Sequence, residues 1–205
     1  MRKLLVSLMI VFMSVALAGQ DELGQKAVTG FIIGGVGILD NLGYTNPLLI
    51  IGGGVELNSK QMLSTSQFTW SLSHKLETQD GHSRKLETAG YKRLGEHFLL
   101  GAGTKYSQLV TSQWSKSAWG PFVGTGYEGD NYRIQARYVV PSFDVQNRLS
   151  GVLGVFDYRA NRHFGTETRW GIYRFKDTRV PGVFYALPAE KHTGAETDLA
   201  VKYFF

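Results

Sequence analysis

The chain contains 205 residues, of which 22 are basic and 17 acidic, giving a formal net charge of +5. It has no cysteine, so a folded domain of this size must be stable without disulfide bonds. The positive excess is small and the basic residues do not cluster, which argues against a nucleic-acid-binding protein. Glycine is frequent, at 25 residues against a usual share of roughly 7%, and aromatic residues make up 13%.

The first 18 residues have the pattern of a secretory signal peptide. Arg2 and Lys3 precede an apolar run over 4–17, and Ala16 and Ala18 supply the small residues of a cleavage site. The run is shorter than the roughly 20 residues that a membrane-spanning helix needs. We therefore expect 1–18 to be removed on export and 19–205 to form one domain.

The rest of the chain divides into about ten segments of strand length, separated alternately by short turns and longer connections. The expected strands are 30–39, 48–57, 61–74, 83–93, 98–107, 119–128, 132–140, 151–158, 164–172 and 196–205, with longer connections at 40–47, 75–82 and 176–191. The first two strands are apolar on both faces and interrupted by glycines. Two arrangements are therefore open: ten strands in one sheet, or eight with this N-terminal hairpin outside or plugging it.

The later strands alternate between apolar and polar residues, as expected where the two faces of a sheet meet different surroundings. The segment 132–140 is the clearest case, because Ile134 and Tyr138 share one face while Arg133 and Arg137 share the other. A strand with an apolar outer face and a charged inner face suits a wall between lipid and a polar interior. The pattern predicts a closed antiparallel transmembrane β-barrel, with a soluble sandwich or lipocalin-like binder as the alternative.

The charged faces would converge on the barrel interior. The residues expected there are Glu128, Arg133, Arg137, Glu167, Arg169, Asp198 and Lys202, joined by Glu56, Lys85 and Glu87. Side chains nearly fill the interior of a barrel of eight to ten strands, and opposite charges can pair there. We interpret the set as a structural network that fills the lumen. A thin polar path for small solutes or hydrophobic molecules is the alternative.

Aromatic residues gather near the ends of the expected strands. One group is Phe98, Tyr127, Tyr132, Tyr158, Phe164 and Phe205, and the other is Trp70, Tyr106, Trp119, Tyr138, Trp170 and Tyr173. Aromatic rings favour membrane interfaces, so each group predicts a girdle on the outer surface. The short turns and both termini would then face the periplasm.

The last strand carries the most specific signal. Leu199, Val201, Tyr203 and Phe205 form its apolar face, and this register with a terminal aromatic residue resembles the C-terminal signature of bacterial outer-membrane β-barrels. The whole mature chain resembles, in pattern, the small barrels of the OmpA-transmembrane, OmpX and OmpW kind. The resemblance implies a monomer in the outer membrane of a Gram-negative bacterium, inserted by the barrel-assembly machinery that reads those four residues. It also implies a role in envelope integrity, surface contact or passage of small molecules.

A lipid-modifying enzyme is a further alternative, because some small outer-membrane barrels use a His with a Ser at the outer rim. The segment His192-Thr193-Gly194 lacks the His-x-Ser spacing of the deacylase family. His74 and His82 flank a loop that holds Asp80, and Ser83 lies beside His82, but a single His at a rim is more often a solvated residue. We predict no catalytic residue, metal site or cofactor.

Basic residues collect near the expected outer rim, where lipopolysaccharide phosphates would be a natural counter-charge. They are Lys75, Arg84, Lys116, Arg148, Lys176, Arg179 and Lys191. The apolar stretch 180–188 lies in the same region and could contact lipid, a partner or the barrel mouth.

Overall fold

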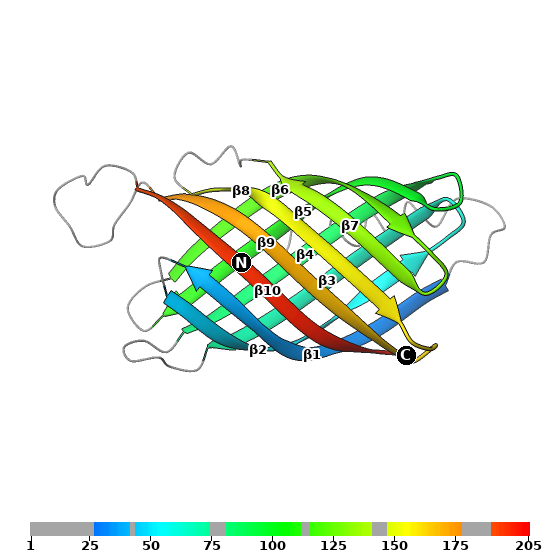
Figure 1. The fold of residues 1–205 in the computed structure, drawn as a ribbon, viewed down its shortest axis with the longest axis horizontal. Helices are drawn as coiled ribbons and strands as arrows, with labels where there is room; N and C mark the ends of the chain where they lie inside the picture. Colours follow the sequence, from blue (N-terminus) through cyan, green and yellow to red (C-terminus); the bar gives the residue numbers. More distant parts are fainter. Residues whose placement is uncertain (1–26, 42–43, 74–80, 112–114, 141–146, 178–189) are drawn as a thin grey trace.

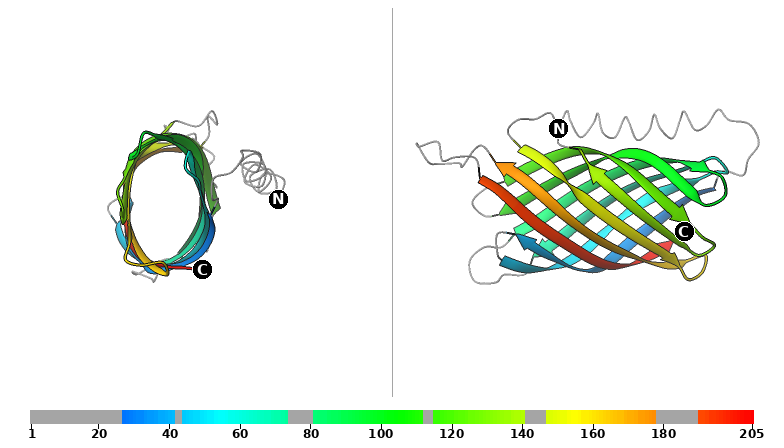
Figure 2. Two further views of the ribbon diagram at one scale, coloured as in Figure 1. Left: turned by 90° about the vertical axis from the view of Figure 1, so that its right-hand side faces the viewer. Right: turned by 45° about the horizontal axis from the view of Figure 1, so that its top comes forward.

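The computed structural model describes residues 27–41, 44–73, 81–111, 115–140, 147–177 and 190–205. Ten antiparallel strands close into a barrel there (Figures 1 and 2). They are β1 (Ala27–Asn41), β2 (Tyr44–Asn58), β3 (Met62–Ser73), β4 (Gly81–Leu94), β5 (Phe98–Thr111), β6 (Ser115–Glu128), β7 (Tyr132–Val139), β8 (Asn147–Arg159), β9 (Phe164–Asp177) and β10 (Glu190–Phe204). No helix among the described residues is long and apolar enough to cross a membrane. The expected signal peptide, 1–18, lies outside the described residues.

Each strand pairs with its neighbours in the chain, and β1 closes the ring against β10, with Phe31 opposite Phe204 and Asn41 opposite Gly194. The prediction of a ten-stranded barrel is confirmed. The eight-stranded alternative is wrong, because β1 pairs with β10 and β2, and β2 also pairs with β3. The β1–β2 hairpin is apolar on both faces for two reasons. Its outer face lies on the exposed, apolar exterior of the barrel, and Phe31 and Ile50 on its inner face pack inside.

Several strands extend beyond their expected bounds at one end of the barrel. The predicted loop 40–47 is wrong, since Asp40 pairs with Thr45 and Asn41 with Tyr44 in the β1–β2 ladder. Likewise β9 runs on to Asp177 and β10 begins at Glu190, so both ends of the predicted 176–191 connection are strand. Polar residues beyond an apolar band can still pair as strands because water solvates their side chains. Alternation of hydrophobicity therefore marks only the apolar part of each strand.

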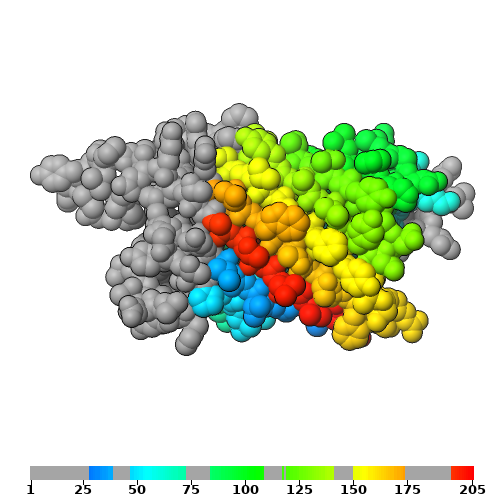
Figure 3. All heavy atoms as spheres, in the orientation of Figure 1, coloured from blue at the N-terminus to red at the C-terminus, as the bar shows by residue number. Residues whose placement is uncertain are grey.

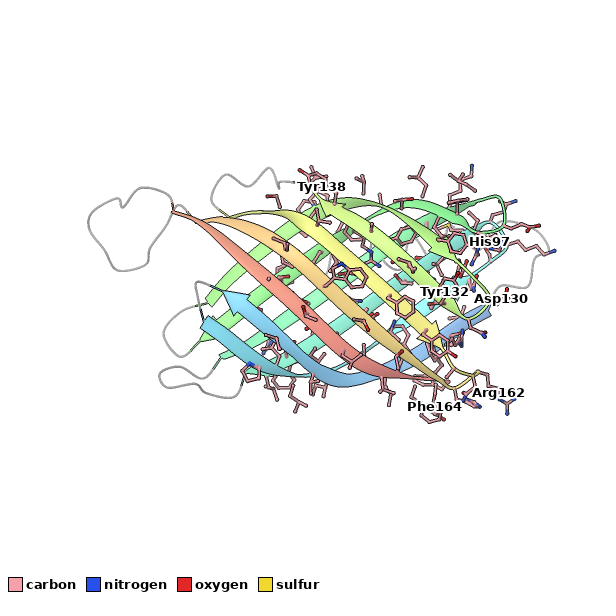
Figure 4. All side chains as sticks on the ribbon, viewed as in Figure 1. His97, Asp130, Tyr132, Tyr138, Arg162 and Phe164 are labelled. Atoms are coloured by element: carbon pink, nitrogen blue, oxygen red, sulfur yellow. The ribbon has the colours of Figure 1, made fainter. Side chains whose placement is uncertain are left out.

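We call the end formed by the short connections 59–61, 95–97, 129–131 and 160–163 the turn end, and the opposite end the loop end. At the turn end, aromatic rings pack against each other across neighbouring strands. The ring centroids of Phe98 and Tyr127 are 5.7 Å apart, those of Tyr127 and Tyr132 are 6.1 Å apart, and those of Phe164 and Tyr203 are 5.3 Å apart. Figure 4 labels Tyr132 and Phe164 at this end, and Tyr138 towards the other.

Nearer the loop end, Trp70, Trp119, Tyr138 and Trp170 are exposed on the outer surface. Tyr173 is not part of that group, so its prediction is wrong: it is only 3% exposed and its hydroxyl accepts a hydrogen bond from Lys105 inside the barrel, at 2.6 Å. The reason is the two-residue period, because Tyr173 follows the outward-facing Ile172 and therefore takes the opposite face.

The distribution of side chains is the reverse of that in a soluble protein. Ile172 is 62% exposed and Val152 57% exposed, whereas Gln135 and Arg137 are buried inside. The soluble-sandwich alternative is wrong, because the apolar faces do not pack on each other. An apolar exterior of this extent is a surface for lipid.

An apolar cluster shares the interior with the charged residues. It comprises Leu63, Ala89, Tyr91, Leu99, Phe122, Val139, Leu153, Val155 and Tyr173. On β4, Lys85 and Glu87 form ion pairs across the lumen with Glu196 and Arg137, and Tyr91 on the same face is fully buried. Close packing of these side chains depends on small neighbours on the inner wall.

Two glycines test that packing. A Cβ atom on inward-facing Gly103 would lie 2.1 Å from the carbonyl oxygen of Thr88 and 2.5 Å from the ring of Phe122. On outward-facing Gly34 it would meet nothing within 4 Å. We expect Gly103→Ala to lower the free energy of unfolding by about 1–3 kcal/mol, and Gly34→Ala to change it by less than about 0.5 kcal/mol. Urea unfolding in lipid vesicles, followed by tryptophan fluorescence, measures both, and equal effects would contradict the close packing.

Candidate functional site

Ion pairs join opposite walls of the barrel at mid-height. Glu87 on β4 accepts hydrogen bonds from Arg137 on β7 and from Arg169 on β9, the latter at 3.2 Å. Strands β4 and β9 are five positions apart in a ring of ten, so this bridge runs directly across the lumen. In end view the barrel is elliptical (Figure 2). Glu87 therefore connects three strands through the middle of the interior.

Arg169 is fully engaged in the same layer. Its Nε atom donates to Glu167 at 2.6 Å, and one Nη atom donates to Gln67 on β3 at 2.9 Å. The amide of Gln67 donates in turn to Glu167 at 3.2 Å, and Lys202 lies 2.6 Å from the other oxygen of that carboxylate. Hydrogen bonds of this kind offset the cost of removing charges from water. Each guanidinium nitrogen of Arg169 thus donates a hydrogen bond within the layer.

A second layer lies nearer the loop end. Lys85 forms an ion pair with Glu196 and lies 3.7 Å from Asp198. Lys105 lies 3.9 Å from Glu196 and donates to the Tyr173 hydroxyl. These contacts join β4 and β5 to β9 and β10, again across the lumen.

The third layer lies at the turn end. Arg133 donates to both oxygens of Glu56 on β2, at 3.1 and 3.2 Å, and lies 3.5 Å from Glu128. Asp157 is 3.9 Å from Arg133 and accepts a hydrogen bond from Lys202 at 2.6 Å. A polar cavity of about 140 Å³ opens beside this layer.

Arg93 links the turns that surround this layer. Its guanidinium donates to the carbonyl oxygens of Ser59 and Met62, which flank the β2–β3 turn. It also donates to Glu128 at the end of β6, at 3.0 and 2.7 Å. The Arg93 side chain thereby connects the end of β4 with the end of β2, the beginning of β3 and the last residue of β6.

The structure places all seven residues of the predicted network inside the barrel, in ion pairs or hydrogen bonds. They are Glu128, Arg133, Arg137, Glu167, Arg169, Asp198 and Lys202. Arg93, Lys105, Asp157 and Glu196 also belong to the network and were missing from the prediction. Strand parity alone identifies them as inward-facing, and that signal was available in the sequence. Which partner each one meets depends on the barrel's closure.

The network contains seven basic and seven acidic residues. Its bases are Lys85, Arg93, Lys105, Arg133, Arg137, Arg169 and Lys202, and its acids are Glu56, Glu87, Glu128, Asp157, Glu167, Glu196 and Asp198. A balanced set that pairs internally leaves no net charge to attract an ion of either sign. The arrangement is suited to filling and stiffening the barrel.

The rim histidines considered for an enzyme are on separate strands, His82 in β4 and His192 in β10, and their side chains lie outside the described residues. Lys75, Arg179 and the apolar stretch 180–188 lie outside them too. Within the described part of the chain, no three His, Asp or Glu residues are placed to hold a metal ion.

No protein-family model matches the chain, and no curated protein matches it in sequence. Solved structures with a similar fold include Neisserial surface protein A (TM-score 0.43, 7% identity, covering 87% of this chain and 97% of that one). The outer-membrane protease OmpT from Escherichia coli gives a TM-score of 0.47 with 10% identity, covering 91% of this chain and 99% of that one. The COG4313 outer-membrane channel from Pseudomonas putida F1 gives 0.42 with 14% identity, covering 90% and 97%.

These three proteins are a surface protein, a protease and a channel, and all three TM-scores lie below 0.5. The similarity concerns the barrel fold of small outer-membrane proteins and transfers no activity to this chain.

Removing Glu87 tests the layer of ion pairs at mid-height, which we call the central layer. Glu87→Ala leaves Arg137 and Arg169 buried without this partner, so we expect the free energy of unfolding to fall by about 3–5 kcal/mol. The control is Glu96→Ala in the β4–β5 turn, where the side chain is 93% exposed and the expected change is below about 0.5 kcal/mol. Urea titration in vesicles compares the two variants. A loss no larger for Glu87 than for Glu96 would contradict a stabilising role of the cross-lumen pairs.

Proposed function

We propose that this protein is an integral outer-membrane β-barrel with a structural or surface-interaction role, and that ion pairs across its lumen keep it closed to solutes. The observation that carries the proposal is the position of Glu87, which is held by Arg137 from β7 and by Arg169 from β9 on the opposite side of the ring. Together with the apolar cluster, this layer occupies the space through which a solute would have to pass.

The exterior supports a location in a membrane. A continuous sheet closes on itself, so the backbone presents no unpaired strand edge to hydrocarbon. The signal pattern of residues 1–18 and the terminal strand favour export and insertion into the outer membrane of a Gram-negative bacterium. Outer-membrane lipid and lipopolysaccharide would then be its immediate partners.

The terminal strand has features suited to recognition during assembly. Leu199, Val201 and Tyr203 are exposed on its outer face, and Phe205 is 72% exposed at the end of the chain. The backbone of Phe205 exchanges two hydrogen bonds with Gly30, at 3.0 and 3.2 Å, which locks the last residue onto β1. In this proposal the barrel-assembly machinery binds the outer face of β10 before β1 takes its place. The proposed product is a monomer, and the ring needs no strand from a second chain to close.

Planar-bilayer recording tests the closed lumen. We expect the wild-type protein to give no steady current, because the central layer bridges the walls. The triple variant Glu87→Ser, Arg137→Ser, Arg169→Ser removes both signs of charge together and is expected to conduct. Glu96→Ser is the matched control and should stay closed.

A steady wild-type current that changes when Arg133 or Glu167 is neutralised would overturn the closed lumen in favour of a narrow pore. Electrophoretic mobility with and without boiling verifies that each variant is a folded barrel before recording.

The terminal residue tests the assembly step. We expect Phe205→Ala to reduce the folded, heat-modifiable protein in the outer-membrane fraction several-fold, because recognition of the strand end is lost. Val28→Ala is the control, since Val28 is a similarly exposed apolar residue at the same end of the barrel, at 63%. Refolding of both variants in detergent, without the machinery, separates recognition from packing. An equal loss in detergent would show that the Phe205 ring acts through packing over Gly30 and not through recognition by the machinery.

A further inference from the structure

The polar cavity beside the third layer lies at the turn end and is lined by residues of β2 and of β6 to β10. Figure 3 shows β7, β8 and β9 side by side, coloured from light green to orange, with their turn end on the right. The charged residues of the lining are the bases Arg133, Arg159 and Lys202 and the acids Glu56, Glu128, Asp130 and Asp157. An apolar occupant would take water from these charges without replacing it, so the cavity suits a polar ligand.

Most of the charges in the lining already have partners. Arg133 is paired with Glu56, and Lys202 is paired with Asp157. The Glu128 carboxylate is paired with a base that lies outside the lining. One base and one acid are left, and these are the two groups that a ligand could neutralise.

Arg159 is the base that is left. Its guanidinium carbon lies 4.2 Å from the centroid of the Phe204 ring, and one terminal nitrogen donates to the carbonyl oxygen of Arg162 at 3.4 Å. Among the described residues, its buried Nε atom has no hydrogen-bond partner and its guanidinium forms no ion pair. Most of its N–H donors are therefore unused, while the Phe204 ring holds the group at the cavity wall.

Asp130 is the acid that is left. It is exposed in the β6–β7 turn and forms no ion pair with any residue that the structure describes. This turn is bound to the end of β8, because the backbone N–H of Arg159 donates to the carbonyl oxygen of Asn131 at 2.7 Å. Figure 4 labels Asp130 at this end of the barrel. The unpaired acid and the unpaired base thus border one cavity from neighbouring segments.

The volume of the cavity sets the size of the ligand. It is about 140 Å³. A protein cavity of roughly 150 Å³ can hold benzene, which corresponds to about six non-hydrogen atoms. Alanine is a molecule of this size, and it carries a carboxylate and an ammonium group on the same carbon atom. A nucleotide or a whole phospholipid is too large to be enclosed there.

We propose that this cavity is a binding site for a small zwitterion of the class of free amino acids. The guanidinium of Arg159 donates to the carboxylate of the ligand, and the ligand's ammonium group donates to the carboxylate of Asp130. Hydrogen bonds in which both groups are charged are the stronger ones. The paired residues of the third layer form the floor of the site and keep their partners.

Both charges of the ligand are needed. An anion that lacks an ammonium group would lie near the four acids of the lining, and a cation that lacks a carboxylate would lie near its three bases. The site itself requires only the closed barrel. Supply of the ligand from the periplasm rests on the proposed outer-membrane location and orientation.

The test is a titration of isotope-labelled protein in detergent micelles with alanine, followed by the NMR chemical shifts of its backbone amides. The amides of Asn131 and Arg159 should shift and saturate, with a dissociation constant of roughly 1 mM for so small a ligand. The amide of Gly95, in the β4–β5 turn outside the lining, should not move.

Matched pairs of variants test the two contacts. Arg159→Gln should weaken alanine binding at least about ten-fold, as expected for a lost hydrogen bond to a charged group. Arg162→Gln is its control, because Arg162 is exposed in the neighbouring turn and does not line the cavity. Asp130→Asn should weaken binding about three-fold, since its carboxylate is exposed, and Glu96→Gln is the control for that change.

Three further ligands test the class of molecule. Acetate and methylammonium, which carry one charge each, should bind at least about ten-fold more weakly than alanine. Phosphoethanolamine, the headgroup of a zwitterionic phospholipid, should not bind more tightly than alanine. Tighter binding of phosphoethanolamine would assign the cavity to a lipid headgroup and overturn the proposal.

The proposal is also overturned by a folded wild-type protein that shows no saturable shift, by equal losses for Arg159→Gln and Arg162→Gln, or by acetate that binds as tightly as alanine. Heat-modifiable mobility verifies that each variant is folded, and fractionation of membranes reports its location. Failure of fractionation alone refutes the proposed location, whereas absence of binding to a folded outer-membrane barrel refutes only this site.

Discussion

Closure of the backbone between β1 and β10 is the constraint on which the other features depend. Once the ladder from Phe31–Phe204 to Asn41–Gly194 is formed, each residue of the wall has either an inside or an outside position. Hydrocarbon selects aliphatic and aromatic residues for the outside, because a charge there would lose its water without gaining a partner. The inside has no such restriction, since partners from other strands are within reach. The reversed distribution of charge and hydrophobicity thus follows from closure of the sheet combined with lipid on its outer side.

The interior is filled in two ways that serve the same end. Apolar side chains such as Tyr91 and Phe122 pack as they would in a soluble core, while three layers of ion pairs tie opposite walls together. Buried ion pairs add little net stability compared with apolar residues of the same size, but breaking one is costly. Their value here lies in fixing which strands lie opposite each other. Glu87 meets both of its guanidinium partners because closure of this ring brings β7 and β9 within reach of β4.

The sequence predicted much of this arrangement from the two-residue period. The alternation in β7 and β10 assigns inner and outer faces correctly, and it places Arg133, Arg137, Asp198 and Lys202 inside. The same rule could not decide whether β1 and β2 belong to the barrel. Their inner faces are apolar and glycine-rich, so the two faces of each strand do not differ in hydrophobicity. Strand ends such as Asp40 and Asn41 were missed because hydropathy changes at the edge of the apolar band, before pairing stops.

Ion-pair partners could not be read from the sequence at all. Lys85 and Glu196 are separated by 111 residues, and Arg137 and Glu87 by 50, so no local spacing connects them. Strand parity identifies Lys105 and Glu196 as inward-facing, but it does not show that they lie near each other. Their roles follow from which walls face each other, and this depends on the number of strands and the stagger between them. The candidate site was thus predictable as a set of inward-facing charges but not as a set of contacts.

The two mouths of the barrel are built with unequal rigidity. Arg93 fastens the β2–β3 turn to the end of β6, and short turns of three or four residues join the strands around it. Because Arg93 and the short turns hold the strand ends together at the turn end, the diameter of the barrel is more restricted there than at the loop end. A change in the diameter of the barrel, such as an adjustment to a bilayer of different thickness, is therefore expected to be smallest at the turn end, beside Arg93.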